Sequence, residues 1–160
     1  MSNTEPLSRD AVLHVRDHCL CLHARRAARS LARRFDLAFQ PLDLTNGQFS
    51  LMMTLNQPQP PRISRLAEFL AMDRTTLTAT LKPLQRRGLV EVLPDPADRR
   101  GKVMRLTDDG RALLKEALPI WERTHAEVDE QLNAGDPNLL RRQLDTLAGV
   151  SYERGDASTD

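Results

Sequence analysis

Two short amphipathic segments, followed at once by a pair of strand-like runs, constrain the fold of this chain more than any other feature. Apolar residues at 63, 66, 67 and 70 give the first segment one buried helical face. Asp73 is a favourable N-cap for a second helix, from Arg74 to Arg87, and Gly88 can supply its left-handed stop. Two short helices joined by so few residues form a helix-turn-helix.

Branched residues are concentrated in two short runs, Leu89–Leu93 and Val103–Thr107. The sequence PDPADRRG between them is rich in turn-forming residues, so the runs predict a β-hairpin with a long, charged tip. A helix-turn-helix followed directly by a hairpin is the winged-helix arrangement, in which the second helix meets the base edges of DNA. We therefore predict a mainly α fold with a small β-hairpin.

One long helix is predicted before this module, over residues 9–40, because apolar residues recur at helical spacing on two neighbouring stripes. Two apolar stripes indicate two packing partners. Pro41 should end this helix, and Thr45 with Gln48 has the capping-box spacing that opens a helix over about residues 46–56. The run QPQPP at 57–61 cannot continue a helix, and we interpret it as a stiff connector.

Two further helices are predicted after the hairpin. Thr107 followed by Asp108 and Asp109 favours a helix start, and this helix should run to about residue 133 with a bend at Pro119. Asp136 should cap a last helix through about residue 149. Residues 151–160 are predicted to form a frayed, disordered tail.

The distribution of charge along the chain is more informative than its net charge of +1. Residues 62–105 contain ten Lys and Arg against five Asp and Glu, a balance of +5, whereas residues 106–160 contain six against twelve, a balance of −6. The predicted winged-helix module is therefore basic and the C-terminal part is acidic. With 40% apolar and 28% charged residues, the 160-residue chain has the composition of a single soluble globular domain.

The sequence predicts a cytoplasmic protein with no membrane partner. It contains no apolar run of the roughly 18 residues that a membrane span needs, and its first ten residues lack the pattern of a secretory signal. Cys19 and Cys21 would project from opposite sides of one helix and could not form a disulfide with each other.

The second helix of the module has an outward face suited to a DNA groove. If its leucines are buried, small, hydroxylated and basic residues lie on the opposite side. These residues are Thr75, Thr78, Ala79, Lys82 and Arg86. Methyl groups can contact thymine, hydroxyls can bond bases or phosphates, and the cations can reach phosphates or guanine. Arg74 should lie near the DNA backbone; the alternative is an ordinary solvated helix face.

The hairpin tip carries three cations, Arg99, Arg100 and Lys102, which repel one another unless an anion is near. Asp98 could orient one of the guanidinium groups. Arginine at a hairpin tip fits a narrow, electronegative minor groove. An ordinary hairpin would also contain Pro, Asp and Gly, but it would not need three cations together.

The residues MDRTTLTATLKPLQRRGLVEVLPDPADRRGKVMRLTDDG at 72–110 resemble the MarR family of transcription regulators, and the resemblance extends over about residues 10–148. It implies one MarR-type domain over residues 1–160. In this domain, helices within 10–40 and 110–149 interleave as a dimer, and residues 45–107 form the winged helix-turn-helix. It also implies recognition-helix roles for Thr75, Thr76, Thr78 and Lys82, a minor-groove role for Arg99 and Arg100, and a salt-bridge role for Asp98.

The resemblance further implies a homodimer that binds a near-palindromic site in double-stranded DNA, with recognition helices roughly 34 Å apart. Members of this family are often released from DNA by small aromatic or phenolic ligands, so we expect a repressor with a small-molecule effector and no cofactor. Pro83 within the recognition helix removes one helical hydrogen bond.

Three alternatives stay open from the sequence. Cys21 resembles the sensing cysteine of the hydroperoxide-responsive OhrR branch, although Arg25 stands where that branch has a tyrosine; Cys19 is the second redox candidate. His14, His18 and Cys21 share one helical face and form a candidate metal site. A winged-helix dimer that acts as a protein scaffold without binding DNA is the third.

An enzyme is not expected. His125 lies among acidic residues in the sequence, but the pattern is that of a solvated helix face. No glycine-rich phosphate loop or nucleophile motif accompanies it.

Overall fold

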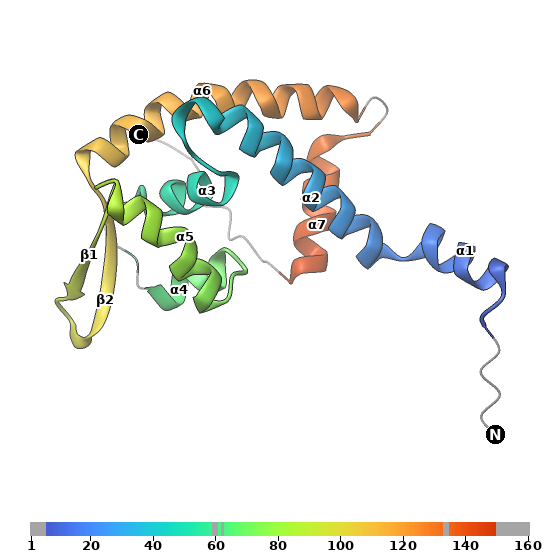
Figure 1. The fold of residues 1–160 in the computed structure, drawn as a ribbon, viewed down its shortest axis with the longest axis horizontal. Coiled ribbons are helices and arrows are strands. Elements are labelled where there is room, and N and C mark those ends of the chain that lie inside the picture. The colour runs from blue at the N-terminus through green and yellow to red at the C-terminus, as the bar shows by residue number, and fades with distance from the viewer. Residues whose placement is uncertain (1–5, 59–60, 62, 133–134, 150–160) are drawn as a thin grey trace, which may run out of the picture. The chain divides into compact units, whose positions relative to one another are not determined.

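A computed structural model describes residues 6–58, 61, 63–132 and 135–149 of the chain (Figure 1). Its elements follow in the order α1 (Arg9–His18), α2 (Leu20–Phe39), the 3₁₀ turn η1 (Gln40–Leu42), α3 (Asn46–Leu55), α4 (Ile63–Phe69), α5 (Arg74–Arg86), β1 (Val90–Asp95), β2 (Asp98–Leu106), α6 (Asp108–Gln131) and α7 (Pro137–Ala148). The chain divides into two compact units between Trp121 and Glu122. The first unit contains the whole predicted module, 45–107.

The helices around the helix-turn-helix begin and end at the capping residues and the glycine that the sequence predicts. The Thr45 hydroxyl accepts a hydrogen bond from the Gln48 backbone N–H at 3.2 Å, and the Gln48 side chain accepts one from the Thr45 N–H at 2.9 Å, so the capping box of α3 is confirmed. Asp73 caps α5 as predicted. Gly88 follows α5 with φ of 69°, the left-handed conformation that glycine adopts at little cost.

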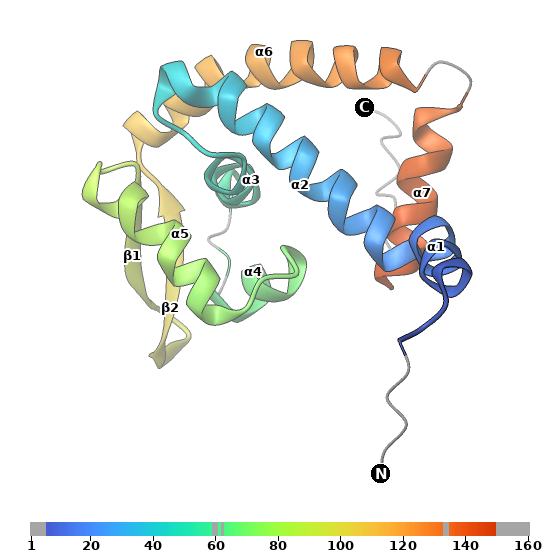
Figure 2. The same ribbon diagram turned by 45° about the vertical axis from the view of Figure 1, so that its right-hand side comes forward.

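The core of the first unit lies where α2, α3, α5, the hairpin and the start of α6 meet. Leu77, Leu81 and Leu84 form the buried face of α5. Both views place α3 between α2 and α5 (Figures 1 and 2). The Phe39 and Phe49 rings stack with centroids 4.7 Å apart. Each large apolar side chain buried here contributes about 1.5–3 kcal/mol, so this packing fixes how α5 is turned.

The hairpin differs from its prediction, because the strands continue into the expected loop. β1 pairs antiparallel with β2 from Val90 opposite Leu106 to Asp95 opposite Asp98, which leaves only a two-residue turn. The Asp95 side chain accepts a hydrogen bond from the Ala97 N–H at 2.9 Å and stabilises this turn. Pro94 is tolerated because β1 pairs on one side only in the described sheet.

The prediction of one unbroken helix over 9–40 is wrong. Cys19 has extended dihedral angles (φ −76°, ψ 101°) and separates α1 from α2. Histidine side chains bond to carbonyl groups at this break: His18 Nδ1 lies 2.9 Å from the His14 oxygen and His23 Nε2 lies 3.3 Å from the Asp17 oxygen. The sequence has neither proline nor glycine at this point, so its apolar pattern could not mark the break.

The same break overturns the candidate metal site. His14 and His18 belong to α1 and their rings stack, with centroids 4.3 Å apart, whereas Cys21 belongs to α2. The three side chains therefore do not share one helical face. Within the described ranges, no three His, Cys, Asp or Glu residues are grouped to hold a metal ion.

The two C-terminal helices form at the predicted places, and the bend at Pro119 stays a prediction. The Thr107 hydroxyl accepts a hydrogen bond from the Gly110 N–H at 3.0 Å at the start of α6. Asp136 caps α7, and Gly149 ends it with φ of 67°. The predicted disordered tail, 151–160, lies outside the described residues. None of the helices in the described part of the chain is long and apolar enough to cross a membrane.

We expect Gly110→Ala to destabilise the protein. A Cβ atom at this position would lie 2.1 Å from the Leu89 carbonyl oxygen, so α6 and the end of α5 would have to separate. The free energy of unfolding, measured by urea titration, should fall by about 2 kcal/mol or more.

Gly47→Ala is the matched control, because Gly47 also lies in the first turn of a helix but an added Cβ there would have only contacts of 4.0 Å. It should be neutral or stabilising by about 0.5–1 kcal/mol. Equal effects of the two substitutions would contradict this packing.

Candidate nucleic-acid interface

The outward face of α5 forms an open hollow of about 540 Å³. Its lining residues are Arg74, Thr75, Thr78, Ala79, Lys82, Pro83 and Arg86. The structure therefore brings together the whole face that the sequence predicts, with Pro83 in addition. This follows from helical geometry, because burial of the leucine face turns these positions outward.

Threonine hydroxyls on this face are held by the helix itself. The Thr78 hydroxyl donates to the Arg74 carbonyl at 2.7 Å, which leaves its oxygen lone pairs and its methyl group available to a partner. Thr80, on the neighbouring side, makes the same type of bond to the Thr76 carbonyl at 2.9 Å. The face thus offers acceptors and methyl groups between cations.

Thr76 lies away from the hollow. Its backbone N–H donates to Asp73 Oδ1 and its hydroxyl donates to Asp73 Oδ2, both at 2.8 Å. These hydrogen bonds lower the pKa of the Asp73 carboxyl. Thr76 therefore takes part in the helix cap. Thr75 and Thr78 line the hollow and Thr76 does not, so a DNA contact by Thr76 stays a prediction.

Pro83 does not interrupt α5, which continues to Arg86. Because proline has no N–H, the Ala79 carbonyl loses the donor that an α-helix would give it. Ala79 and Pro83 both line the hollow, so the position that lacks this helical hydrogen bond belongs to the exposed face.

The cations of the module fall into two groups. Arg74, Lys82 and Arg86 are exposed, and none of them forms an ion pair within the described chain. Arg105, by contrast, pairs across the hairpin with Glu91 at 2.6 Å. The cations that line the hollow are therefore the ones that remain available to an anionic partner.

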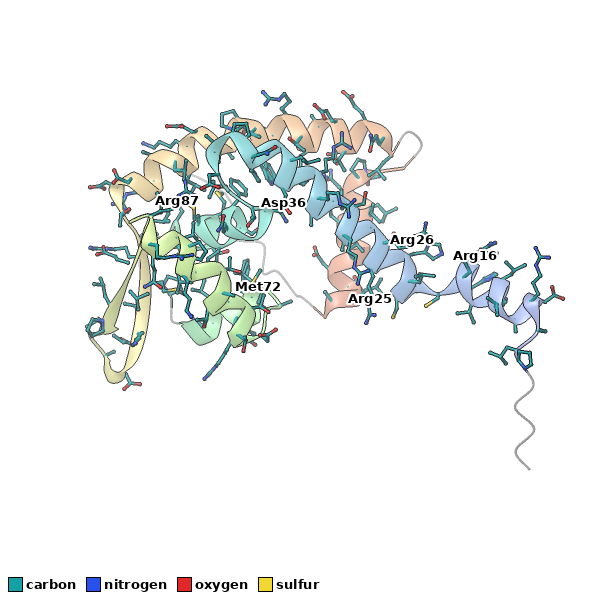
Figure 3. The ribbon with its side chains drawn as sticks, in the orientation of Figure 1. Arg16, Arg25, Arg26, Asp36, Met72 and Arg87 are labelled. Carbon is teal, nitrogen blue, oxygen red and sulfur yellow. The ribbon has the colours of Figure 1, made fainter. Side chains whose placement is uncertain are left out.

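Arg87 is an anchor rather than a contact residue. Its guanidinium donates to the Leu42 carbonyl at 3.1 Å and to the Asp43 carbonyl, and lies 3.9 Å from the Asp43 carboxylate. Asp43 itself adopts a left-handed conformation with φ of 50°. Figure 3 shows Arg87 at the end of α5 and Asp36 on α2. Sequence reasoning missed this role, because nothing in the adjacent pair Arg86–Arg87 indicates which arginine turns inward.

A second, smaller hollow of about 270 Å³ lies beside this anchor. It is lined by Asp36, Gln40, Asp43, Leu44, Thr45, Gln48, Pro83 and Arg87. Pro83 lines both hollows, so the second one adjoins the body of α5 as well as its end.

The hairpin tip is organised by Asp95, a residue that sequence reasoning did not single out. Asp95 is buried, with 6% of its surface exposed, and it lies close to Gly101, where an added Cβ would be 3.0 Å from the Asp95 Cβ. Its position at the start of a D-P-A-D turn was the available signal. Asp98 begins β2 opposite Asp95, and its salt-bridge role stays a prediction.

The predicted wing cations lie on β2. The backbone of residues 99–101 bulges between the pairs Pro94–Lys102 and Asp95–Asp98. Lys102 is exposed. The side chains of Arg99 and Arg100 lie outside the described part of the structure, so their minor-groove role stays a prediction.

The remaining candidate groups are not gathered into a catalytic arrangement. Cys21 is exposed, Cys19 is half-buried, and both are free thiols. His125 is partly buried, and burial, followed by the charge of Arg141, lowers its pKa. Asp129 beside it pairs with Arg141, which lowers the pKa of that carboxyl. These contacts are those of a helix–helix contact surface.

Comparison with known proteins places the module in a family. A family model described as the MarR family matches residues 44–102, a range that includes every residue lining the larger hollow. The HTH-type transcriptional repressor NicR of Pseudomonas putida is 33% identical to this chain over 107 residues, which cover 64% of this chain and 68% of NicR.

Solved structures agree with this match. The transcriptional regulator MosR of M. tuberculosis, in complex with DNA, is 39% identical and superposes with a TM-score of 0.74 over 82% of this chain and 95% of that one. A MarR variant from E. coli, complexed with operator DNA, is 26% identical, with a TM-score of 0.75 over 84% of this chain and 97% of its own.

We expect Arg87→Met to destabilise the protein and Arg86→Met to leave its stability unchanged. The first substitution removes two charge-assisted hydrogen bonds to backbone carbonyls, whereas Arg86 makes no such bond to the described part of the chain. Because the Arg87 side chain is 32% exposed, the loss should be about 1–2 kcal/mol rather than the larger value of a fully buried pair. Urea unfolding of both variants measures the difference. A stable Arg87→Met protein would show that α5 does not depend on this anchor.

Proposed function

This chain belongs to the MarR family of DNA-binding transcriptional regulators, which are not enzymes, and we propose that it is a sequence-specific repressor. In this proposal a homodimer binds a near-palindromic site in double-stranded DNA and is released by a small molecule. The observation that carries the proposal is the outward face of α5, where a hollow of about 540 Å³ coincides with three cations that form no ion pair with any residue the structure describes.

The proposed DNA contact places α5 in the major groove. That groove is about 12 Å wide and admits one α-helix. Thr75, Thr78 and Ala79 would meet base edges and thymine methyl groups through the small side chains of the face. Lys82 and Arg86, farther along the helix, would contact phosphates or guanine, and Arg74 would contact the backbone at the helix start.

The hairpin would contact the neighbouring minor groove. Arg99, Arg100 and Lys102 occur on the strand that follows the tight turn, and the narrow minor groove attracts cationic side chains. The contacts of α5 and the hairpin would lie on one unit of the chain, because both elements belong to residues 1–121.

A homodimer is supported by apolar side chains that a single chain leaves exposed. Leu139, Leu140, Leu144 and Leu147 of α7 are all exposed, Leu147 by 68%. Val12 and Val15 of α1 are exposed as well. Apolar faces of this kind are buried in obligate dimers, and a two-fold axis relates two recognition helices to the halves of a palindrome.

The second hollow is the proposed place for a small-molecule effector. A ligand there would touch Pro83 and Arg87, and so would bias the position of α5 relative to η1. The lining carboxylates of Asp36 and Asp43 favour a neutral or cationic ligand over an anionic one at this place.

We expect Lys82→Ala to weaken DNA binding and to change sequence choice, because Lys82 lies on the face proposed to read bases. Loss of one base or phosphate contact should cost about 1–3 kcal/mol, roughly tenfold or more in affinity. Fluorescence anisotropy against a set of operator variants measures both effects.

Thr76→Val is the matched control for Lys82→Ala. It removes the hydroxyl bond to Asp73 and should lower helix stability while leaving DNA affinity of the folded protein unchanged. The assignment of the α5 face would be wrong if Thr76→Val reduced affinity more than Lys82→Ala.

We expect replacement of both Arg99 and Arg100 by Ala to weaken binding to all sequences about equally. Minor-groove and phosphate contacts carry little base information, and their loss should also reduce the salt dependence of affinity by up to about two charges. Titrations at several salt concentrations test this expectation. Unchanged affinity of the double variant would remove the hairpin from the proposed interface.

A further inference from the structure

Four exposed arginines lie on one side of α2, and the proposed DNA contact does not use them. They are Arg25, Arg26, Arg29 and Arg33, which we call the arginine ridge. The buried side chains of this helix, Phe35 and Phe39, project from a different side. Figure 3 shows Arg25 and Arg26 on the N-terminal half of α2.

The arginine ridge has no internal counter-charge. In the described ranges, none of its four guanidinium groups forms an ion pair. Arg25, Arg29 and Arg33 follow one another at i, i+4 spacing, at which like charges destabilise a helix. Asp36 lies at the end of the ridge, but its carboxylate accepts a hydrogen bond from the Asn46 N–H at 2.7 Å. The ridge therefore calls for an anionic partner from outside.

An exposed leucine adjoins the ridge and favours a protein partner over DNA. Leu37, one helical turn after Arg33, is 65% exposed on α2. A phosphate backbone would neutralise the arginines but would bring charge next to this leucine. A protein surface with carboxylates and apolar side chains covers both kinds of residue.

The chain itself contains such a surface in its second unit. Its residues, 122–160, carry a charge balance of −5, from four Lys and Arg against nine Asp and Glu. Asp129 and Asp136 are paired with arginines of α7. Glu122 and Glu130 of α6 are exposed and form no ion pair among the described residues. The exposed leucines of α7 belong to the same unit.

We propose that the arginine ridge is bound by the acidic second unit of another copy of this chain, with Glu122 and Glu130 among the residues that meet it. This inference rests on the homodimer of the proposed function and adds that charge selects the partner. A two-fold axis would repeat the contact, so each dimer would contain two ridges and two acidic surfaces. Complementary charges mainly set specificity and association rate.

Charge reversal with mixing tests the proposal in the full-length chain. The ridge variant combines Arg25→Glu, Arg29→Glu and Arg33→Glu, and the acid variant combines Glu122→Arg and Glu130→Arg. Each variant alone should dimerise more weakly than the native chain, with the dissociation constant raised about a hundredfold and about tenfold, respectively. Sedimentation velocity over a range of protein concentrations measures both constants.

An equimolar mixture of the two variants should restore dimerisation to within about threefold of the native chain, because both contacts then regain opposite charges. If the second unit bound the ridge of its own chain instead, the mixture would not recover, and the proposal would be wrong. The proposal would also be wrong if the ridge variant dimerised as tightly as the native chain. If that dimer had lost affinity for DNA, the ridge would be assigned to DNA binding instead. Neither result would contradict the proposal that the protein is a repressor.

Arg65→Glu with Lys115→Glu is the control for net charge, since it lowers the charge of the same unit without changing the ridge. This control should dimerise like the native chain. Circular dichroism and thermal unfolding establish that each variant is folded. Should the ridge variant fail to fold, Arg29→Ala with Arg33→Ala replaces it, with an expected loss of about tenfold. Native dimerisation should also weaken as salt rises, and a salt-independent native dimer would contradict the proposal.

Discussion

The burial of one face of α5 is the interaction on which the rest of this structure depends. Leu77, Leu81 and Leu84 pack into the core of the first unit and determine how α5 is rotated about its axis. The same rotation decides which residues face outward, since helical geometry places them on the opposite side. Thr107 then ties the hairpin to the end of α5 through a hydrogen bond of 2.7 Å to the Gly88 carbonyl. The recognition face and the hairpin are thus held in one packed unit.

The partners of the arginines divide the basic residues into structural and available groups. Arg87 and Arg105 are committed to carbonyls and to Glu91, whereas Arg74 and Arg86 are not committed within the described chain. The ridge on α2 forms a second available group. The net charge of +1 does not show this division, because the negative charges of the second unit cancel positive charges of the first. DNA and a second copy of the chain would each bind one of the two available groups.

The sequence was sufficient to predict those features that depend on residues close together in the chain. The capping residues Thr45 and Asp73 and the glycine at 88 set helix ends as predicted, and the leucine spacing of α5 predicted its outward face. It was insufficient where a tertiary contact decided. The break at Cys19 has no local breaker, and the strands extend through the expected loop because Asp95 stabilises a tighter turn. The choice between Arg86 and Arg87 depends on carbonyls about forty-five residues away in sequence, those of Leu42 and Asp43.

The salt dependence of DNA affinity is the most direct test that the α5 face and the hairpin form a DNA-binding surface. The full-length protein would be titrated against a duplex from its own promoter and against an unrelated duplex of equal length, at several salt concentrations. We predict tighter binding to the promoter and a logarithm of affinity that falls linearly with the logarithm of salt concentration, with a slope of several charges. A flat salt response together with equal affinity for the two duplexes would contradict a DNA-binding role and would favour a protein scaffold.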